Sequence, residues 1–558
     1  MSTYDDASLV LVPSGYKNGI VFSQKPMDAN GQLTFTRASS ATRVQSDGLI
    51  EKVRTNLLLQ SVWPNIGTGV APTSWAASTT NFSAGPLAGQ LLCNTSASRG
   101  FITQSVSLTA GQYALSVFVD SVTTSGQINQ MISIFGATSL KYYEDGIEVS
   151  GTASIVAGKR YAVVGTVTTG SFSMRIGSGV DANATNNFVI SRPQLEVSDF
   201  GATDYIPTTT TAVSVGPVSG LPRLDYLGST CPRLLLEPQR TNFLLNNLSI
   251  IGNTTSGQAT PIVSPDGYEN GRLPIPSSTA SRFEFIFAGG TFASGTVLTY
   301  SWFVKTVSTP ASPSPTTGQL TQFTASVNAT AGTPTKMADY GNGWERWSIT
   351  YTVVNGAVNS TLRAYYGGVI GIGNSSVAYY GHQVEQGTYA TSLIINQSAA
   401  VTRVADAASK TGISSLIGQT EGAFYAEWEV TQADGGVYEI SLSDGSASNA
   451  VRLRQNSSNT MQLVVASSGA VVASISSGTT IVVGQRYKLA AAYKLNDFVF
   501  YLNGTQVGSD SSGAVPATLT SIGTSRGDGN FPFYGELNQA LIFKTRLDNA
   551  TLQSLTTL

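Results

Sequence analysis

Short apolar runs alternate with turn residues along most of the chain. In residues 344–351, Trp347, Ile349 and Tyr351 recur at every second position, as on the buried face of a strand. Asn503-Gly504 separates two such runs and predicts a hairpin. Because Gly, Asn and Ser bound these runs, the pattern predicts an all-β protein. Similar runs occupy residues 113–119, 298–304, 423–430 and 498–502.

A duplicated unit fills much of the first 400 residues. An Arg-Thr-Asn motif begins it at Arg54 and again at Arg240, 186 residues later. A Gln-x-Glu motif ends it at residues 194–196 and again at residues 383–385. Between these motifs lie short strands with turn residues, in a unit of about 140 residues, which fits a two-sheet jelly roll better than a helical or α/β domain.

These signals divide the chain into tandem β-sandwich domains, two repeated jelly rolls and one sandwich of a different pattern. The predicted parts are an N-terminal docking or connector segment at 1–53, the first jelly roll at 54–215, a connector at 216–239, the second jelly roll at 240–405 and the last sandwich at 406–558.

The two connecting segments are predicted to be ordered. Pro222, Pro232 and Pro238 interrupt the second one and favour extended chain over helix. Both segments carry many Leu, Val and Phe residues, which a free linker would expose to water. We therefore expect them to lie against neighbouring domains. Residues 547–552 are predicted to form a short helix.

Composition supports the β class and excludes several partners. Only 11% of the 558 residues are charged, and 31 basic residues nearly balance 33 acidic ones. Since no Lys/Arg cluster is present to neutralise phosphates, we expect no nucleic-acid partner. No apolar run is long enough to span a membrane and the N-terminus lacks a signal-peptide core, so we expect no membrane partner and a soluble protein made in the cytoplasm.

The connecting segments carry a resemblance to a known family. Their motifs are Leu-Val-Pro-Ser-Gly-Tyr-Lys at 11–17, Ala-Thr-Arg-Val at 41–44 and Pro-Arg-Leu-Asp-Tyr at 222–226. They resemble virion proteins of tailed bacteriophages, of the tail fibre, head fibre or appendage type found in crAss-like phages. The resemblance implies a place in the virion, assembled in the bacterial cytoplasm, with other virion proteins as partners. We also expect a homo-oligomer, because edge strands of sandwiches are natural surfaces for self-association.

Within that resemblance, the repeated unit looks like a carbohydrate-binding-module jelly roll. Its Gly-Asn-Gly-Trp-x-Arg strand stands at residues 341–346, and its closing Gln-x-Glu occurs in both copies. The last part is similar to laminin-G or concanavalin-A-like sandwiches, through Tyr-Leu-Asn-Gly at 501–504 and Gly-Glu-Leu at 535–537. The resemblance therefore implies modules of a type that binds carbohydrate.

The residue inventory argues against catalysis. His382 is the only histidine, no second group is present to build a triad around it, and we interpret it as structural. We expect no metal, because His/Cys clusters are absent and the Asp28-Ala29-Asn30-Gly31 turn lacks the later carboxylate of a calcium loop. No cofactor motif is present either. Glu196 and Glu385 recur at equivalent positions, which suggests a requirement of the fold rather than an active site.

Exposed aromatic side chains are the remaining candidates for chemistry, because aromatic rings stack on sugars. Trp344, Tyr365 and Tyr366 are the candidate glycan contacts, and Trp63 and Trp75 are further candidates. For any one of them, packing in a sandwich core is the competing explanation.

We expect no enzymatic activity. The leading hypothesis is a structural phage virion protein, a tail or head fibre or appendage that projects β-sandwich modules in particle decoration or host attachment. The alternatives are an adhesin that binds a host surface glycan, and a glycan depolymerase, which would need two carboxylates about 5–9 Å apart.

Overall fold

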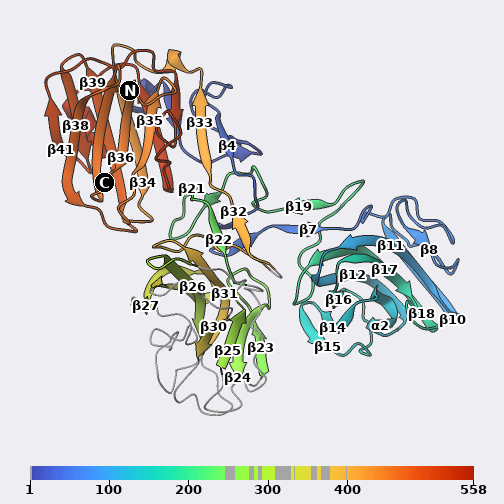
Figure 1. Ribbon diagram of the computed structural model, residues 1–558. Helices are drawn as coiled ribbons and strands as arrows, with labels where there is room; N and C mark the ends of the chain where they lie inside the picture. Colours follow the sequence, from blue (N-terminus) through green and yellow to red (C-terminus); the bar gives the residue numbers. More distant parts are fainter. Residues whose placement is uncertain are drawn as a thin grey trace.

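A computed structural model confirms the predicted all-β class, since nearly all of its regular structure is strand. Three groups of strands surround a centre where β21 (Arg233–Leu236), β22 (Arg240–Asn242) and β32 (Val401–Arg403) come together (Figure 1). No helix in the described ranges is long and apolar enough to cross a membrane. The structure describes residues 3–244, 258–275, 282–286, 292–307, 329–331, 333–353, 361–365, 377–396 and 399–558.

The first sandwich packs a seven-stranded sheet, β15-β14-β16-β12-β18-β10-β9, against a four-stranded sheet, β13-β17-β11-β8. Trp63 and Trp75 lie in its core as an edge-to-face pair with ring centroids 5.8 Å apart. Its elements are β8 (Ala76–Ala77), β9 (Phe82–Ala84), β10 (Gln90–Ser98), β11 (Gly100–Leu108), β12 (Gly111–Thr124), α2 (Ile128–Met131), β13 (Ile132–Phe135), β14 (Thr138–Glu144), β15 (Ile147–Val149), β16 (Lys159–Val167), β17 (Gly170–Ser178) and β18 (Ala184–Val197).

The second sandwich repeats the central pairing of the first. In the first, β12 pairs with β16 and β18; in the second, β26 pairs with β29 and β31. The repeat in the sequence is therefore a repeat in the structure. Its described elements are β23 (Gln258–Ile262), β24 (Gly271–Ile275), β25 (Arg282–Ile286), β26 (Val297–Thr306), β27 (Ala329–Ala331), β28 (Thr335–Tyr340), η1 (Gly341–Gly343), β29 (Trp344–Val353), β30 (Thr361–Tyr365) and β31 (Val377–Gln386).

The C-terminal sandwich consists of two large sheets, and the predicted hairpin at Asn503-Gly504 joins β40 to β41. One sheet has the order β20-β21-β43-β34-β39-β40-β41 and the other β2-β3-β4-β33-β42-β35-β36-β37-β38. The elements from residue 407 on are β33 (Ala407–Thr411), η2 (Ser414–Leu416), β34 (Glu421–Glu429), β35 (Tyr438–Ser443), β36 (Ala450–Gln455), β37 (Thr460–Ser467), β38 (Ala470–Thr480), β39 (Arg486–Lys494), β40 (Asp497–Leu502), β41 (Thr505–Asp510), β42 (Ser521–Gly523), β43 (Gly535–Phe543) and α3 (Asn549–Thr556).

Residues 1–53, predicted to be an ordered segment that lies against a neighbouring domain, contribute strands to the C-terminal sandwich. Leu9 pairs with Ile542 of β43, and Phe35 pairs with Ala408 of β33, so strands from the two ends of the chain share both sheets. The elements contributed from residues 1–56 are α1 (Thr3–Asp6), β1 (Leu9–Leu11), β2 (Tyr16–Lys17), β3 (Ile20–Val21), β4 (Leu33–Thr36), β5 (Thr42–Val44), β6 (Ile50–Lys52) and β7 (Arg54–Asn56).

The connector at 216–239 also joins the C-terminal sandwich, because Leu234 of β21 pairs with Leu537 of β43 and both are buried. The reason is the same as for the N-terminal segment: their apolar side chains fill the core between the sheets. The connecting strands are β19 (Val213–Val215), β20 (Leu224–Asp225), β21 (Arg233–Leu236), β22 (Arg240–Asn242) and β32 (Val401–Arg403).

The outer face of the β34 sheet is covered, and that of the β35 sheet carries polar residues. On β34, Phe424 faces the core between the sheets, whereas Tyr425 faces outward and packs with Leu552 of α3 and Val10 of β1. Helix α3 is thereby the predicted C-terminal helix, and the Asp548 side chain caps it by accepting the Thr551 N–H at 2.7 Å.

A buried ion network joins the connecting segments at the centre of the molecule. Arg223 contacts both Asp406 and Glu237, the latter at 2.6 Å. Arg37 lies 3.1 Å from Asp406, and Arg403 lies 2.7 Å from Glu237. The three guanidinium groups are almost completely shielded from water, and buried charges persist only when they are paired in this way. The network holds together the segments that connect the second sandwich and the C-terminal sandwich.

Candidate functional site

The Arg-Thr-Asn and Gln-x-Glu motifs meet at one end of the first sandwich. Asn56 is completely buried, and its side-chain oxygen accepts the N–H groups of Leu58 and Leu195, each at 3.1 Å. Its amide donates to the Ile206 carbonyl at 2.8 Å. The Gln194 oxygen accepts the N–H of the same Ile206 at 2.7 Å. The two motifs therefore attach the ends of the unit to each other.

Glu196 binds the chain that leaves the sandwich. Its carboxylate accepts the Thr203 N–H at 2.8 Å and the Thr203 hydroxyl at 2.5 Å. In the second copy, Glu385 accepts the N–H of Thr391 at 2.9 Å and also its hydroxyl. Both carboxylates thus hold an equivalent loop. The interpretation of this repeated glutamate as a requirement of the fold agrees with these contacts.

His382 lies in the core of the second sandwich. The side chain is 1% exposed, and its Nδ1 lies 2.6 Å from the Tyr300 hydroxyl. The imidazole stacks between Tyr300 and Tyr379, with ring centroids 6.0 and 6.3 Å away. Burial lowers the pKa of His382 from 6.5 to about 3, so the ring is neutral near pH 7. These contacts support a structural histidine.

The candidate glycan contacts are Trp344, Tyr365 and Tyr366, and the structure describes the side chain of Trp344 alone among them. Trp344 is completely buried, packs against Tyr380 at 6.4 Å between ring centroids, and donates its indole N–H to the Val263 carbonyl at 3.0 Å. The prediction that Trp344 contacts a glycan is therefore wrong, because no face of its ring reaches the surface. Tyr365 ends β30, where only its backbone pairing is described, and Tyr366 lies outside the described residues. The prediction that these two tyrosines contact a glycan therefore lies outside the described side chains.

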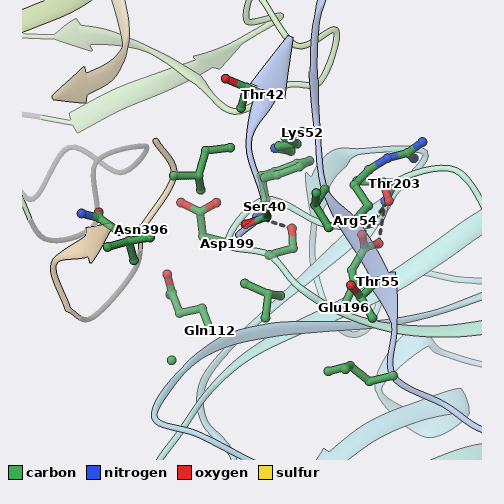
Figure 2. A pocket seen from close by; sticks show the side chains of 18 of the residues that line it. Ser40, Thr42, Lys52, Arg54, Thr55, Gln112, Glu196, Asp199, Thr203 and Asn396 are labelled. Carbon is green, nitrogen blue, oxygen red and sulfur yellow. Dashed lines mark hydrogen bonds between the residues drawn. The ribbon is translucent and has the colours of Figure 1, made fainter. Parts of the chain in front are cut away.

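A cleft of about 640 Å³ lies between the first sandwich, strands β6 and β7, and the end of the second sandwich. Figure 2 shows Lys52 and Arg54 on one side and Gln112 and Asn396 on the other, with Asp199 between them. The cleft thus collects side chains from three parts of the chain that lie far apart in sequence.

Lys52 and Glu196, two charged groups of this cleft, already have partners. Lys52 Nζ lies 2.6 Å from the Asp266 carboxylate. The Glu196 carboxylate accepts hydrogen bonds from Thr203, which dashed lines mark in Figure 2. Phe200 lies beside Lys52, whose Nζ is 4.9 Å from the ring centroid. Because these groups already have partners, we interpret the cleft as a junction between domains.

The outer face of β35 to β38 carries a line of polar side chains. Arg454 Nε donates to the Gln462 side-chain oxygen at 3.0 Å, and the Gln462 amide donates to the Ser474 hydroxyl at 2.9 Å. These residues lie on neighbouring strands, because Arg454 pairs with Gln462 across β36 and β37. We call Arg454, Gln462 and Ser474 the polar ladder. Its planar amide and guanidinium groups stand at the surface of the sheet.

The loop at 525–533 lies against β35, the strand next to β36 of the polar ladder. Phe531 is 39% exposed and has a left-handed backbone, φ 51°, which is strained for a bulky residue. Its carbonyl accepts the Glu439 N–H at 3.3 Å, and this contact fixes the loop to β35. The Arg526 guanidinium lies 4.6 Å from the centroid of the Phe531 ring and pairs with Asp528 at 2.7 Å. An aromatic ring thus stands beside planar polar groups.

Glu439 lies beneath this loop. It is completely buried, and neither carboxylate oxygen accepts a hydrogen bond, although Arg454 Nη1 is 3.6 Å away. Burial raises the pKa of Glu439, and the neighbouring Arg452, Arg454 and Arg526 oppose that rise. Sequence reasoning missed this cluster, although the alternation of polar and apolar residues in 450–455 places Arg452 and Arg454 on one face.

The described residues contain no group of three or more His, Cys, Asp and Glu side chains arranged for a metal ion. In the Asp28 turn, the Asp28 carboxylate accepts the Asn30 N–H at 2.8 Å, as in an ordinary Asx turn. Cys93 is buried and Cys231 is exposed, and both thiols are free.

Comparison with known proteins identifies the last domain. Residues 420–553 match the family model described as the concanavalin A-like lectin/glucanases superfamily. The C-terminal sandwich is therefore a concanavalin A-like domain, which confirms that part of the resemblance. No curated protein matches the chain.

Solved structures similar to the chain include carbohydrate-binding modules. The CBM40 module of the IT-sialidase from Ruminococcus gnavus, bound to α2,3-sialyllactose, is 10% identical; the match covers 25% of this chain and 84% of that chain, with a TM-score of 0.23. The CBM66 module from Bacillus subtilis is 15% identical, with coverages of 24% and 78% and a TM-score of 0.17. A SAP-like pentraxin from Limulus polyphemus is 14% identical, with coverages of 25% and 70% and a TM-score of 0.21.

Proposed function

We propose that this protein binds glycans without cleaving them, through the outer face of the β35 to β38 sheet in its concanavalin A-like domain. The observation that carries the proposal is the exposed Phe531 ring on the loop next to β35, in the same sheet as the strands of the polar ladder. The family match of residues 420–553 supports it, because that superfamily includes lectins.

The chemistry of this face suits a sugar. An aromatic ring packs on the apolar face of a pyranose, while planar polar side chains exchange hydrogen bonds with its hydroxyl groups. Phe531 supplies the ring, and Arg454 and Gln462 supply donors and an acceptor in a fixed arrangement, because they already bond each other. Glu439 and its arginine neighbours anchor the loop that carries Phe531.

A glycan array probed with the full chain tests the proposal. We expect saturable binding to a defined set of glycans, reduced at least about tenfold by Phe531→Ala, since loss of a stacking ring costs on the order of 1.5 kcal/mol or more. Phe135→Ala is the matched control, because Phe135 is also an exposed ring, 52% exposed, with the Arg175 guanidinium 3.3 Å from its centroid.

Binding that Phe531→Ala leaves unchanged, or that Phe135→Ala removes equally, would contradict the proposed surface. Release of reducing ends from a bound polysaccharide would contradict a non-catalytic function.

A second candidate function is the virion appendage, with other virion proteins and further copies of the chain as partners. The buried ion network around Arg223 favours it, because a fixed array of sandwiches is what a projecting particle component requires. The connecting segments that resemble phage virion proteins supply Arg37, Arg223 and Glu237 to this network. Mass spectrometry of purified tailed-phage particles, from a culture that produces the chain, is expected to recover its peptides with the particles; their recovery only from the unassembled fraction would refute this function.

A further inference from the structure

A pocket of about 410 Å³ lies on the outer face of the seven-stranded sheet of the first sandwich. On β12, Val117 and Val119 face the core, so Phe118 between them faces outward and lines the pocket. Arg192 lines it from β18, and Tyr268 lines it from the turn between β23 and β24 of the second sandwich. The volume falls in the range of about 300–1,000 Å³ that small-molecule sites occupy.

The duplicated unit shows what is unusual about Arg192. The last strand of each copy, β18 or β31, bulges next to Phe118 or Phe303. Arg192 lies in the first bulge and Gly381 in the second, each two residues before the glutamine of the Gln-x-Glu motif. Both have a left-handed backbone, with φ 54° and 57°, which glycine adopts freely and arginine only with strain. A strained arginine where the other copy has glycine indicates a function for its side chain.

In the second sandwich the equivalent face is sealed by apolar side chains. A Cβ on Gly381 would lie 2.9 Å from the Phe303 ring and 3.2 Å from Leu393, so these two side chains fill the space. Ile50 packs in the same cluster, and Phe303 is completely buried. In the first sandwich Tyr205 takes the place of Leu393, because the residue after each donates its N–H to the glutamine of the Gln-x-Glu motif. The first sandwich therefore has an open pocket where the second has a core.

Arg192 presents hydrogen-bond donors to this pocket. Its side chain is 48% exposed, and its guanidinium carbon lies 4.0 Å from the centroid of the half-buried Phe118 ring. Asp120 is 3.8 Å away, beyond hydrogen-bond distance, so the N–H groups of Arg192 can bind a ligand. By contrast, the Arg160 guanidinium already donates to the Ser116 hydroxyl, at 2.7 Å from Nη2.

The pocket also has an exposed acceptor, Asp204. Its side chain is 87% exposed, accepts the Tyr268 hydroxyl at 3.3 Å, and lies 3.7 Å from Arg54. A carboxylate has about four lone-pair sites, so Asp204 can accept further hydrogen bonds. Tyr205 and Tyr268 are half-buried and add aromatic rings to the lining. The pocket thus combines donors, an acceptor and rings.

Opposite charges nearly balance across the lining. The charged residues that line the pocket are Arg160, Arg192, Asp145, Asp204 and Glu269. Because the two signs nearly cancel, an anion would gain little Coulomb attraction and would lose its hydration. The lining instead suits a neutral ligand whose hydroxyl groups both donate and accept, and which has an apolar face for an aromatic ring. A sugar ring has both features.

We propose that this pocket is a second binding site, which takes a neutral saccharide. Arg192 donates to neighbouring sugar hydroxyl groups, Asp204 accepts from another, and the Tyr205 ring packs on the apolar face of the sugar. The site lies in the first sandwich, outside the polar ladder and the Phe531 loop, so it goes beyond the proposed function and does not depend on it.

Isothermal titration of the full chain tests the site, in the Phe531→Ala background so that the proposed face of the β35 to β38 sheet does not contribute. The probes are cello-, xylo-, manno- and galacto-oligosaccharides, with oligogalacturonate as the charged comparison. We expect saturable binding of at least one neutral probe, weakened at least about tenfold by Arg192→Gly and by Tyr205→Leu. Both substitutions introduce the residue that the second sandwich has at the equivalent position.

The same variants separate binding from folding. Because glycine relieves the left-handed backbone, Arg192→Gly should leave the midpoint of thermal unfolding unchanged or raise it. Arg175→Met is the matched control: the Arg175 guanidinium also lies over an aromatic ring, 3.3 Å from the Phe135 centroid, but on the other sheet of the sandwich and outside the pocket. We expect this control to keep the full affinity.

Four results would overturn the pocket. They are binding that Arg192→Gly and Tyr205→Leu leave unchanged, an equal loss of binding in Arg175→Met, no saturable binding of any neutral probe, and binding of oligogalacturonate alone. The proposed function is tested separately, by the glycan array with the wild-type chain and Phe531→Ala, so failure of one site is distinguishable from failure of the other.

Discussion

The Asn56 side chain accepts the backbone N–H of Leu195 at 3.1 Å and so joins the first strand of the repeated unit to its last. Asn242 accepts the N–H of Val384 at the same distance in the second unit. Both asparagines are completely buried. In each repeat, one asparagine amide therefore joins the first strand to the last strand, which is far away in the sequence.

Replacing this amide is expected to destabilise the unit that contains it. Asn56→Ala leaves the N–H groups of Leu58 and Leu195 buried without an acceptor, each at a cost of about 1–3 kcal/mol. Denaturant unfolding should show a drop of roughly 2–5 kcal/mol in the free energy of unfolding of the first sandwich. The exposed Asn30→Ala serves as control, and an equal loss there would contradict the role assigned to Asn56.

The buried ion network is expected to keep the sandwiches in a fixed arrangement relative to one another. Arg223→Met leaves Asp406 and Glu237 without their shared guanidinium, and breaking a buried pair by removing one partner costs about 3–5 kcal/mol. Small-angle scattering should show a larger radius of gyration as the domains separate. Arg175→Met, which removes a half-exposed pair with Asp181, should leave the scattering curve unchanged. Matching curves for the wild type and Arg223→Met would refute the prediction.

The single histidine is expected to make stability depend on pH between about 3 and 6.5. Burial lowers the pKa of His382 from 6.5 to about 3, so only the unfolded chain takes up its proton in that window. The free energy of unfolding therefore falls by about 1.4 kcal/mol for each pH unit below 6.5. Comparing unfolding of the wild type and His382→Leu at several pH values isolates this effect, because carboxylates titrate in both; identical slopes would contradict it.

The two thiols are expected to react differently. Burial raises the pKa of Cys93 far above its ordinary value, whereas Cys231 is exposed. An aromatic disulfide reagent should modify one thiol in the native protein and two in denaturant. Native Cys231→Ser should then show no rapid reaction; if it does, Cys93 is accessible and the core packing described for it is incorrect.

Local sequence patterns correctly predicted much of the fold. Alternation along β29 and the Asn503-Gly504 turn mark strands because side-chain direction and turn conformation depend on neighbouring residues. The repeat predicted that Glu196 and Glu385 serve the fold, since the same contact recurs in both copies.

Burial and long-range contact were decided by the tertiary structure. The alternation in β29 does not decide whether the face that carries Trp344 is buried. The tertiary structure decides it, because Tyr380 packs against the Trp344 ring. The Phe531 loop follows β42, which pairs with β35 although β36 to β41 lie between them in the chain. This pairing brings the loop to the sheet that carries the polar ladder.

The sequence by itself determined that this is an all-β chain with a duplicated sandwich and a last sandwich of another pattern. The tertiary structure decided that Leu9 pairs with Ile542, which makes the N-terminal segment part of the last sandwich, and that Phe118 and Tyr268 line one pocket. The physical reason is the separation in sequence of the residues that interact. A strand's periodicity is set by adjacent residues, whereas these contacts depend on which apolar faces find each other across hundreds of residues.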